Sequence, residues 1–168
     1  MKNRENKKGF TLIEILIVIG LIAILATIVL VALNPARQFA QGRNSQRTSN
    51  VNAILNAVGQ RIADGKGTFA GLIPGSSPAQ TCPGLTVGAA PLLTVDTDYP
   101  IHIDDDTGVV GGNLHMKCLA PTYMPAYPLD PKTGAGNDIG YDLRIDTNGR
   151  ITIKAPDAEL GETISVTR

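Results

Sequence analysis

The sequence is poor in the residues and motifs on which many enzymes rely. Its 168 residues include only two histidines and two cysteines. No serine or cysteine lies in a recognisable nucleophile motif, and there is no glycine-rich loop of the form G-x-x-x-x-G-K-S/T to hold a phosphate. We therefore expect a protein that is not an enzyme and that needs no cofactor.

The chain also lacks an excess of charge of either sign, with fifteen basic and fifteen acidic residues. A dedicated nucleic-acid binder needs a basic surface that holds phosphates against salt, so this balance argues against one. The charges are unevenly placed: residues 1–9 carry +3, and every charge in residues 37–63 is positive. From residue 64 onward thirteen acidic residues face seven basic ones, which predicts a basic stem and an acidic body.

No recognisable metal-binding motif is present either. Aspartates cluster at residues 104–106 and within residues 130–138, and carboxylate oxygens are ligands that calcium prefers. Neither stretch has the spacing of an EF-hand loop, whereas Asp and Asn commonly form turns. The sequence therefore predicts solvated turns, with calcium binding as the less favoured alternative. His102 and His115 are interpreted as isolated strand residues, so no metal site is expected.

What the sequence does have is one long apolar segment near its N-terminus. Residues 10–33 are mostly apolar, and the nineteen residues 15–33 carry no charge. A cleaved secretory signal has an apolar stretch of about 7–15 residues, whereas a membrane-spanning helix needs about 20. The length therefore favours a membrane-spanning helix. The basic residues before it place the N-terminus in the cytoplasm and export the rest of the chain.

The two cysteines, Cys82 and Cys118, both lie beyond this apolar segment. If the segment anchors an exported chain, both cysteines are on the oxidising side of the membrane, where disulfides form and persist. We therefore predict a disulfide between Cys82 and Cys118 rather than two free thiols.

The order of residues at the start of the apolar segment is specific. It reads Lys7-Lys8-Gly9-Phe10-Thr11-Leu12-Ile13-Glu14. This string resembles the type IV prepilin leader, in which basic residues precede a glycine at the cleavage point, a phenylalanine begins the mature chain and a glutamate follows four residues later. The resemblance covers about thirty residues. By itself, Glu14 could be a side chain that reaches the headgroup layer, but an ordinary membrane anchor rarely has this order of residues.

The resemblance implies that a membrane prepilin peptidase cuts between Gly9 and Phe10 and methylates the new amino group of Phe10. It also implies that Glu14 pairs with the Phe10 amine of a neighbouring subunit in a helical filament. The expected partners are copies of the chain itself, the peptidase, the inner-membrane pilus assembly machinery and, before assembly, membrane lipid. The precursor would lie in the cytoplasmic membrane and the mature protein in an extracellular or periplasmic filament.

A second helical segment follows the apolar one. Asn34-Pro35 either interrupts the first helix or caps and begins a new one. The apolar positions at helical spacing are Val51, Ile54, Leu55, Val58 and Ile62. This face is expected to pack on a sheet. Three polar residues are interpreted as lying off the stripe, either solvated or against adjacent subunits: Arg43, Arg47 and Gln60. Gly65 and Gly67 are expected to end the helix.

The remainder of the chain predicts loops and short strands. Residues 139–145 and 151–154 alternate apolar with polar residues around a turn at 147–149, which predicts a hairpin. Residues 163–166, 99–103 and 114–118 are further candidate strands. The expected fold class is α+β and type IV pilin-like, with a long N-terminal helix on a small antiparallel sheet. The expected divisions are a leader (1–9), a transmembrane or filament-stem helix (10–33), an amphipathic half-helix (34–64) and an α+β globular head (65–168).

The sequence thus favours a structural filament subunit. The alternative within the family is a pseudopilin of a type II secretion or DNA-uptake system, which leaves open DNA contact by competence-type filaments. The rival outside the family is a membrane-anchored binding domain or enzyme, against which the missing catalytic motifs argue. Neighbouring genes or the length of purified filaments would distinguish pilin from pseudopilin.

Overall fold

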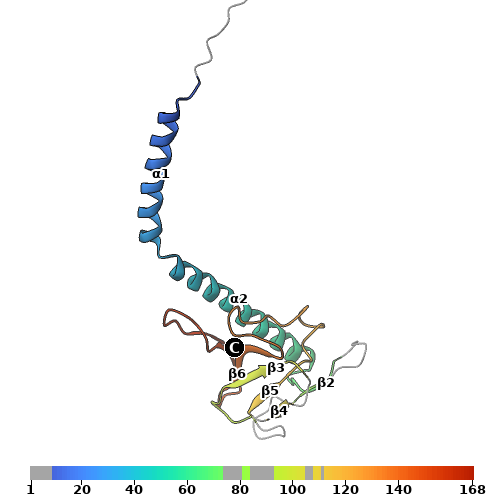
Figure 1. The fold of residues 1–168 in the computed structure, drawn as a ribbon. Coiled ribbons are helices and arrows are strands. Elements are labelled where there is room, and N and C mark those ends of the chain that lie inside the picture. Colours follow the sequence, from blue (N-terminus) through green and yellow to red (C-terminus); the bar gives the residue numbers. More distant parts are fainter. Residues whose placement is uncertain (1–8, 74–80, 84–92, 105–107, 111) are drawn as a thin grey trace, which may run out of the picture. The chain divides into compact units, whose positions relative to one another are not determined.

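The computed structural model describes the chain apart from residues 1–8, 74–80, 84–92, 105–107 and 111 (Figure 1). The chain forms two compact units, Met1–Phe39 and Ala40–Arg168. The helices are α1 (Leu12–Leu33) and α2 (Pro35–Asp64). The strands are β1 (Gly71–Leu72), β2 (Thr81–Cys82), β3 (Tyr99–His102), β4 (Gly108–Val110), β5 (Asn113–His115), β6 (Asp138–Ile145), β7 (Ile151–Ala155) and β8 (Ile164–Thr167).

Helix α1 is apolar on all sides. Thr11 caps its N-terminus, because the Thr11 side chain accepts a hydrogen bond from the backbone N–H of Glu14 at 3.3 Å. The large apolar side chains from Leu12 to Val31 are 46–80% exposed. By length and composition, Leu12–Ala32 could cross a membrane. An apolar helix with this much exposed surface requires a lipid or protein environment.

Asn34 plays both of the roles that the sequence left open. Its backbone adopts the left-handed conformation, with φ 41°, and ends α1. It also caps α2, since the Arg37 N–H lies 3.4 Å from the Asn34 side-chain oxygen. Pro35 is then the first residue of α2, where its missing N–H costs nothing.

The buried face of α2 runs along most of the helix. It comprises Ala40, Asn44, Arg47, Val51, Ile54, Leu55, Ala57, Val58 and Arg61. The predicted apolar stripe is therefore confirmed, with Ile62 partly buried beside it. At the C-terminus, Gly67 N–H donates to the Ile62 carbonyl and Lys66 N–H to the Ala63 carbonyl. This pair of bonds is a Schellman motif, and it ends the helix where Gly65 and Gly67 predicted.

Six strands form the main sheet, in the order β4-β5-β3-β6-β7-β8. The predicted hairpin is confirmed as β6 and β7, which pair antiparallel, and β8 adds to β7. The expectation of an antiparallel sheet is wrong in one place, because β3 and β5 pair in parallel. The reason is topological: the chain reverses from β3 into β4 and reverses again into β5. Strand β5 therefore runs in the direction of β3 and pairs beside it, and the sheet is mixed.

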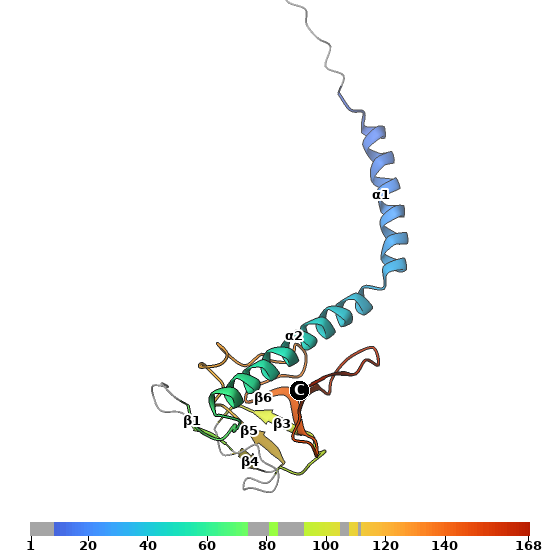
Figure 2. The same ribbon diagram turned by 180° about the vertical axis from the view of Figure 1, so that it is seen from behind.

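The core lies between α2 and the inward residues of this sheet. Along β6 the odd-numbered residues from Ile139 to Ile145 are buried and the even-numbered ones are not, as a half-covered strand requires. Ile54 of α2, Ile101 of β3 and Leu114 of β5 are fully buried in the same cluster. Figure 2 shows, from behind, the second half of α2 lying next to the strands. The core thus holds the second half of α2 to the sheet.

Candidate functional site: the N-terminal motif and the contacts of the head

The residues of the leader motif come at the beginning of α1. Gly9 and Phe10 precede the helix, and the Phe10 side chain is 81% exposed. Glu14 lies in the first turn of α1 and is also exposed. A carboxylate in the first turn interacts favourably with the positive end of the helix dipole. Residues 1–8, which hold the rest of the predicted leader, lie outside the described part of the chain.

A short non-helical stretch therefore precedes the apolar helix. The bond between Gly9 and Phe10 lies in non-helical chain, and the apolar helix begins two residues after Phe10. A family model described as the prokaryotic N-terminal methylation motif matches residues 4–30. The chain carries the prepilin-type motif of type IV pilins. Neither the curated proteins nor the solved structures that were compared yield a match.

The motif supports a protein of the type IV pilin or pseudopilin type. It implies processing by a prepilin peptidase and assembly into pilus-like filaments, and together with α1 it indicates membrane insertion as a precursor. Proteins with this motif are typically structural. An apolar N-terminal helix followed by a mixed sheet is consistent with the α+β fold of type IV pilins.

A charged network, which the sequence analysis did not single out, lies between α2 and two later loops. Arg47 is 0% exposed, and its Nε and Nη2 donate to the two carboxylate oxygens of Asp130 at 2.6 and 3.0 Å. Its Nη1 donates to Asn44 at 3.0 Å and to Glu159 at 3.1 Å. Arg43 donates to the same Glu159 at 2.6 and 2.9 Å. The network fastens residues 43–47 of α2 to the loops that contain Asp130 and Glu159.

The titration of these groups reflects their pairing. Burial by itself would raise the pKa of Asp130, but hydrogen bonds from Arg47 and from the backbone of Thr133 and Lys132 outweigh burial and hold it at about 2. The pKa of Glu159 is lowered to about 2, chiefly by hydrogen bonds from Arg43. The pKa of Arg47 is raised, chiefly by Asp130. All of these groups are therefore charged at neutral pH.

The expectation that Arg47 is solvated is wrong, and the sequence did contain a signal against it. Arg47 precedes Val51 by four residues and Ile54 by seven, so it lies on the N-terminal extension of the apolar stripe. A charged residue on that stripe is either buried with a partner of opposite charge or exposed to solvent where the helix extends beyond the sheet. Which of the two occurs depends on residues more than eighty positions away, and no local pattern identifies Asp130 as the partner.

The same contacts correct the interpretation of solvated turns for Asp130, whereas residues 131–138 are exposed or partly exposed, as that interpretation expected. Asp130 is 3% exposed, and its Oδ1 also accepts hydrogen bonds from the N–H groups of Lys132 and Thr133, at 2.8 and 3.0 Å. Its carboxylate oxygens are therefore bound to a cation and to two amides, which leaves little capacity for a calcium ion. Of the other aspartate cluster, residues 105 and 106 lie outside the described residues.

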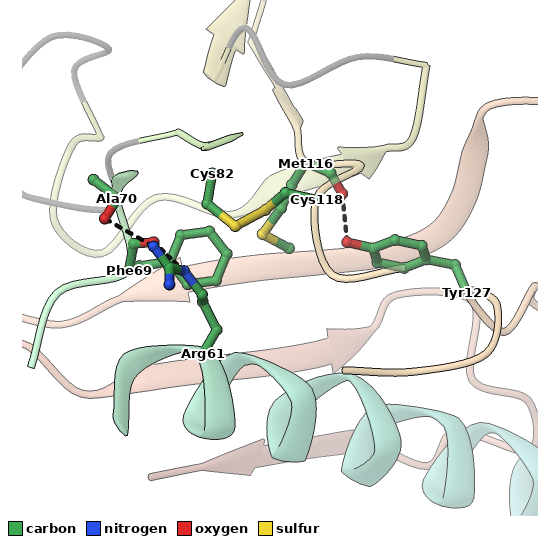
Figure 3. The surroundings of a disulfide bond; sticks show 7 residues. All are labelled: Arg61, Phe69, Ala70, Cys82, Met116, Cys118 and Tyr127. Atoms are coloured by element: carbon green, nitrogen blue, oxygen red, sulfur yellow. Dashed lines mark hydrogen bonds between the residues drawn. A yellow bond between two sulfur atoms is a disulfide. The ribbon is translucent and has the colours of Figure 1, made fainter. Parts of the chain in front are cut away.

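Cys82 and Cys118 are joined by a disulfide, as predicted. Both are buried, and Figure 3 shows the bond beside Met116, with Arg61 of α2 and the chain at Phe69 on the other side. The Arg61 Nε donates to the Phe69 carbonyl at 2.8 Å. Cys82 ends β2, and β1 and β2 form a separate two-stranded sheet. Strands of two residues have little stability of their own, so the disulfide anchors this small sheet to the core.

Replacing both cysteines with serine should lower the free energy of unfolding of the head by about 3–4 kcal/mol in the chain-entropy model. The bond spans 36 residues, so its loss releases a long loop in the unfolded chain. Urea unfolding of the detergent-solubilised protein, followed by tyrosine signals, measures the difference. Added reductant should destabilise the wild-type protein and leave the double variant unchanged. Equal stability of the two proteins would contradict an anchoring role.

The interpretation of His102 and His115 as isolated residues is also wrong. They are Cα partners in the parallel pairing of β3 with β5, and their ring centroids are 5.2 Å apart. The pairing was not predicted, because the sequence analysis expected an antiparallel sheet, in which these two strands would not run side by side in the same direction.

Proposed function

We propose that the chain is a structural subunit of a type IV pilus-like filament and is not an enzyme. The observation that carries the proposal is the prepilin-type motif at the N-terminus of α1, a helix whose apolar side chains are exposed and are not packed against other described residues. Such a helix is stable in a bilayer before assembly and against copies of itself afterwards, since both environments exclude water. The same surface thus serves membrane insertion and polymerisation in turn.

Cleavage between Gly9 and Phe10 would convert the membrane-inserted precursor into a subunit that can polymerise. The leader carries the positive charge that retains the N-terminus in the cytoplasm, so its removal releases α1 from that restraint. Cleavage also creates an ammonium group on Phe10, whose methylation retains the positive charge. We infer that this group pairs with Glu14 of a neighbouring subunit, because each charge alone is costly in an apolar bundle and the pair is tolerable.

Each part of the chain would have its own task. Residues 1–9 are the leader, residues 10–33 the transmembrane and filament-stem helix, residues 34–64 the amphipathic helical part and residues 65–168 the head. The partners would be other copies of the chain, the prepilin peptidase and the inner-membrane assembly machinery. The requirement for one Glu14 for each Phe10 amine would favour a single vertical register between neighbouring subunits.

The mature protein should begin at Phe10 and carry one methyl group on its amino terminus. Intact mass and N-terminal sequencing of protein from the native host measure both features. The control is the same chain expressed without a prepilin peptidase, which should retain residues 1–9. A mature chain that retained the leader in the native host, or that began after residue 33, would contradict the proposal.

A further inference from the structure

Three potential metal ligands converge at one end of the main sheet. His102 is the last residue of β3 and His115 the last residue of β5, and these parallel strands hold them side by side. Both alternate with buried core residues, Ile101 and Leu114, so the histidines lie on the opposite face of the sheet. Asp104 follows two residues after His102, and its Oδ1 lies 2.7 Å from Nδ1 of His115.

Their spacing suits a shared ion. One ligand atom from each of His102, Asp104 and His115 lies within 4.8 Å of the others. The ligand atoms of a tetrahedral zinc site, with bonds of about 2.0–2.1 Å, lie roughly 3.3 Å apart. The Asp104–His115 pair would have to open by about 0.6 Å and the wider pairs to close by up to about 1.5 Å. The Asp104 side chain is 38% exposed, so a change of its rotamer by such distances would not have to displace the buried core.

An ion pair between Asp104 and His115 explains only two of these three groups. The His102 ring has its own contact with the His115 ring, at 5.2 Å between centroids and with an interplanar angle of 41°. Backbone pairing of β3 with β5 therefore brings the two imidazoles together, and the Asp104 carboxylate approaches them from the chain that follows β3. The His115 side chain is only 13% exposed, which restricts it to a few rotamers and reduces the entropy lost on binding an ion.

We propose that His102, Asp104 and His115 bind a divalent transition-metal ion of the zinc class. Imidazole nitrogen combined with one carboxylate oxygen is a donor set that suits Zn²⁺ and its neighbours, whereas Ca²⁺ and Mg²⁺ require mostly oxygen ligands. Three protein ligands leave a fourth position for water. Bound there, the ion cross-links β3, β5 and the chain that follows β3, and it stabilises the head by mass action because the unfolded chain does not hold the three groups together.

The test uses the full-length chain, purified in detergent without a histidine tag and stripped of metal with a chelator. Zn²⁺ titrated in a calorimeter should bind at one ion per chain, and Co²⁺ should give visible ligand-field bands that Zn²⁺ abolishes. Replacing either histidine, as His102→Ala or His115→Ala, should weaken Zn²⁺ binding by more than about 100-fold, since even indirect ligand partners are worth about 10–100-fold. Asp104→Asn should weaken it at least about tenfold.

Asp138→Asn is the matched control. Asp138 is the Cα partner of His102 on the neighbouring strand β6, and an asparagine there retains the oxygen that accepts from the Gly140 N–H. This variant removes one negative charge beside the site without removing a ligand, so it should bind Zn²⁺ within about threefold of wild type. An equal loss in Asp138→Asn and Asp104→Asn would overturn the proposal, because it would show general attraction of cations to an acidic surface.

Thermal unfolding gives a second measurement, and its main comparison, Zn²⁺ against Mg²⁺, needs only the wild-type protein. Zn²⁺ should raise the melting temperature of the wild-type head, and Mg²⁺ at the same concentration should not. A folded His115→Ala protein, judged by its circular dichroism and its intact disulfide, should show no rise. Absence of Zn²⁺ binding to the wild-type chain, or unchanged binding in both histidine variants, would refute the site.

Discussion

Replacing Glu14 with alanine should abolish surface filaments while leaving the amount of membrane-inserted protein unchanged. Insertion is expected to survive, because the change makes α1 more apolar and leaves the basic leader intact. Assembly is expected to fail, because the Phe10 ammonium group would enter an apolar bundle without its counter-charge. Removing one half of a buried ion pair costs about 3–5 kcal/mol, and that cost would recur at each addition of a subunit. Blotting of membranes and quantification of sheared filaments measure the two quantities.

Two further variants separate charge from shape at this position. Glu14→Gln retains the size of the side chain and loses its charge, so it should fail as completely as alanine does. Thr27→Ala is the control within α1, since the Thr27 hydroxyl bonds only to the Ala23 carbonyl of the same helix among the described contacts. That variant should assemble at nearly the wild-type level. A normal filament yield from Glu14→Ala would show that Glu14 merely reaches the headgroup layer, and the pairing mechanism would have to be abandoned.

Replacing Arg47 with methionine should lower the free energy of unfolding of the head by about 3–5 kcal/mol. Both side chains of the Arg47–Asp130 pair are 0% exposed, so the variant leaves a carboxylate buried without its guanidinium. Arg43→Met is the matched control on the same helix. Arg43 shares Glu159 with Arg47 but is 34% exposed, and Glu159 would keep its other cations. The loss in Arg43→Met should therefore be much smaller. Urea unfolding measures both losses.

Removing both partners should restore much of the stability lost in Arg47→Met. In the double variant Arg47→Met with Asp130→Asn, the asparagine retains the oxygen that accepts from Lys132 and Thr133 while the unpaired charge disappears. Replacing a buried ion pair by neutral groups is often close to neutral in stability. If the double variant were as unstable as the sum of the single variants, the pair would not act as a unit.

The pH dependence of the Arg47→Met defect gives an independent check. In the wild-type head the pKa of Asp130 is about 2, below the ordinary 3.8, so its stabilising contribution is complete above about pH 4 and is lost as the pH falls towards 2. In Arg47→Met the Asp130 carboxyl would lose the hydrogen bonds that lower its pKa most, so we expect that pKa to rise, and lowering the pH should protonate the carboxylate and relieve the defect. The difference between the two proteins should therefore shrink in acid. Asp142, whose pKa burial raises to about 6, is present in both proteins and cancels.

The sequence predicted the elements whose signals are local. The period of the apolar residues identified the stripe of α2, and the alternation around residues 147–149 identified the β6–β7 hairpin. The roles of Asn34 and Pro35 follow from backbone geometry alone, although the sequence could not show that one asparagine both ends α1 and caps α2. The disulfide was predicted because there are only two cysteines and both follow the segment that is expected to anchor an exported chain.

By itself the sequence also determined the N-terminal motif, since recognition of a leader depends on the identity and order of adjacent residues that no tertiary contact alters. Only the tertiary structure decided the fate of the charged residues in the head. Arg47 can be buried because the fold brings the Asp130 carboxylate, 83 positions away in the sequence, within hydrogen-bonding distance of its guanidinium. His102 and His115 meet because β5 pairs in parallel with β3. Such pairings depend on which strands become neighbours, and that outcome is set by burial of the whole core rather than by any pattern near the residues themselves.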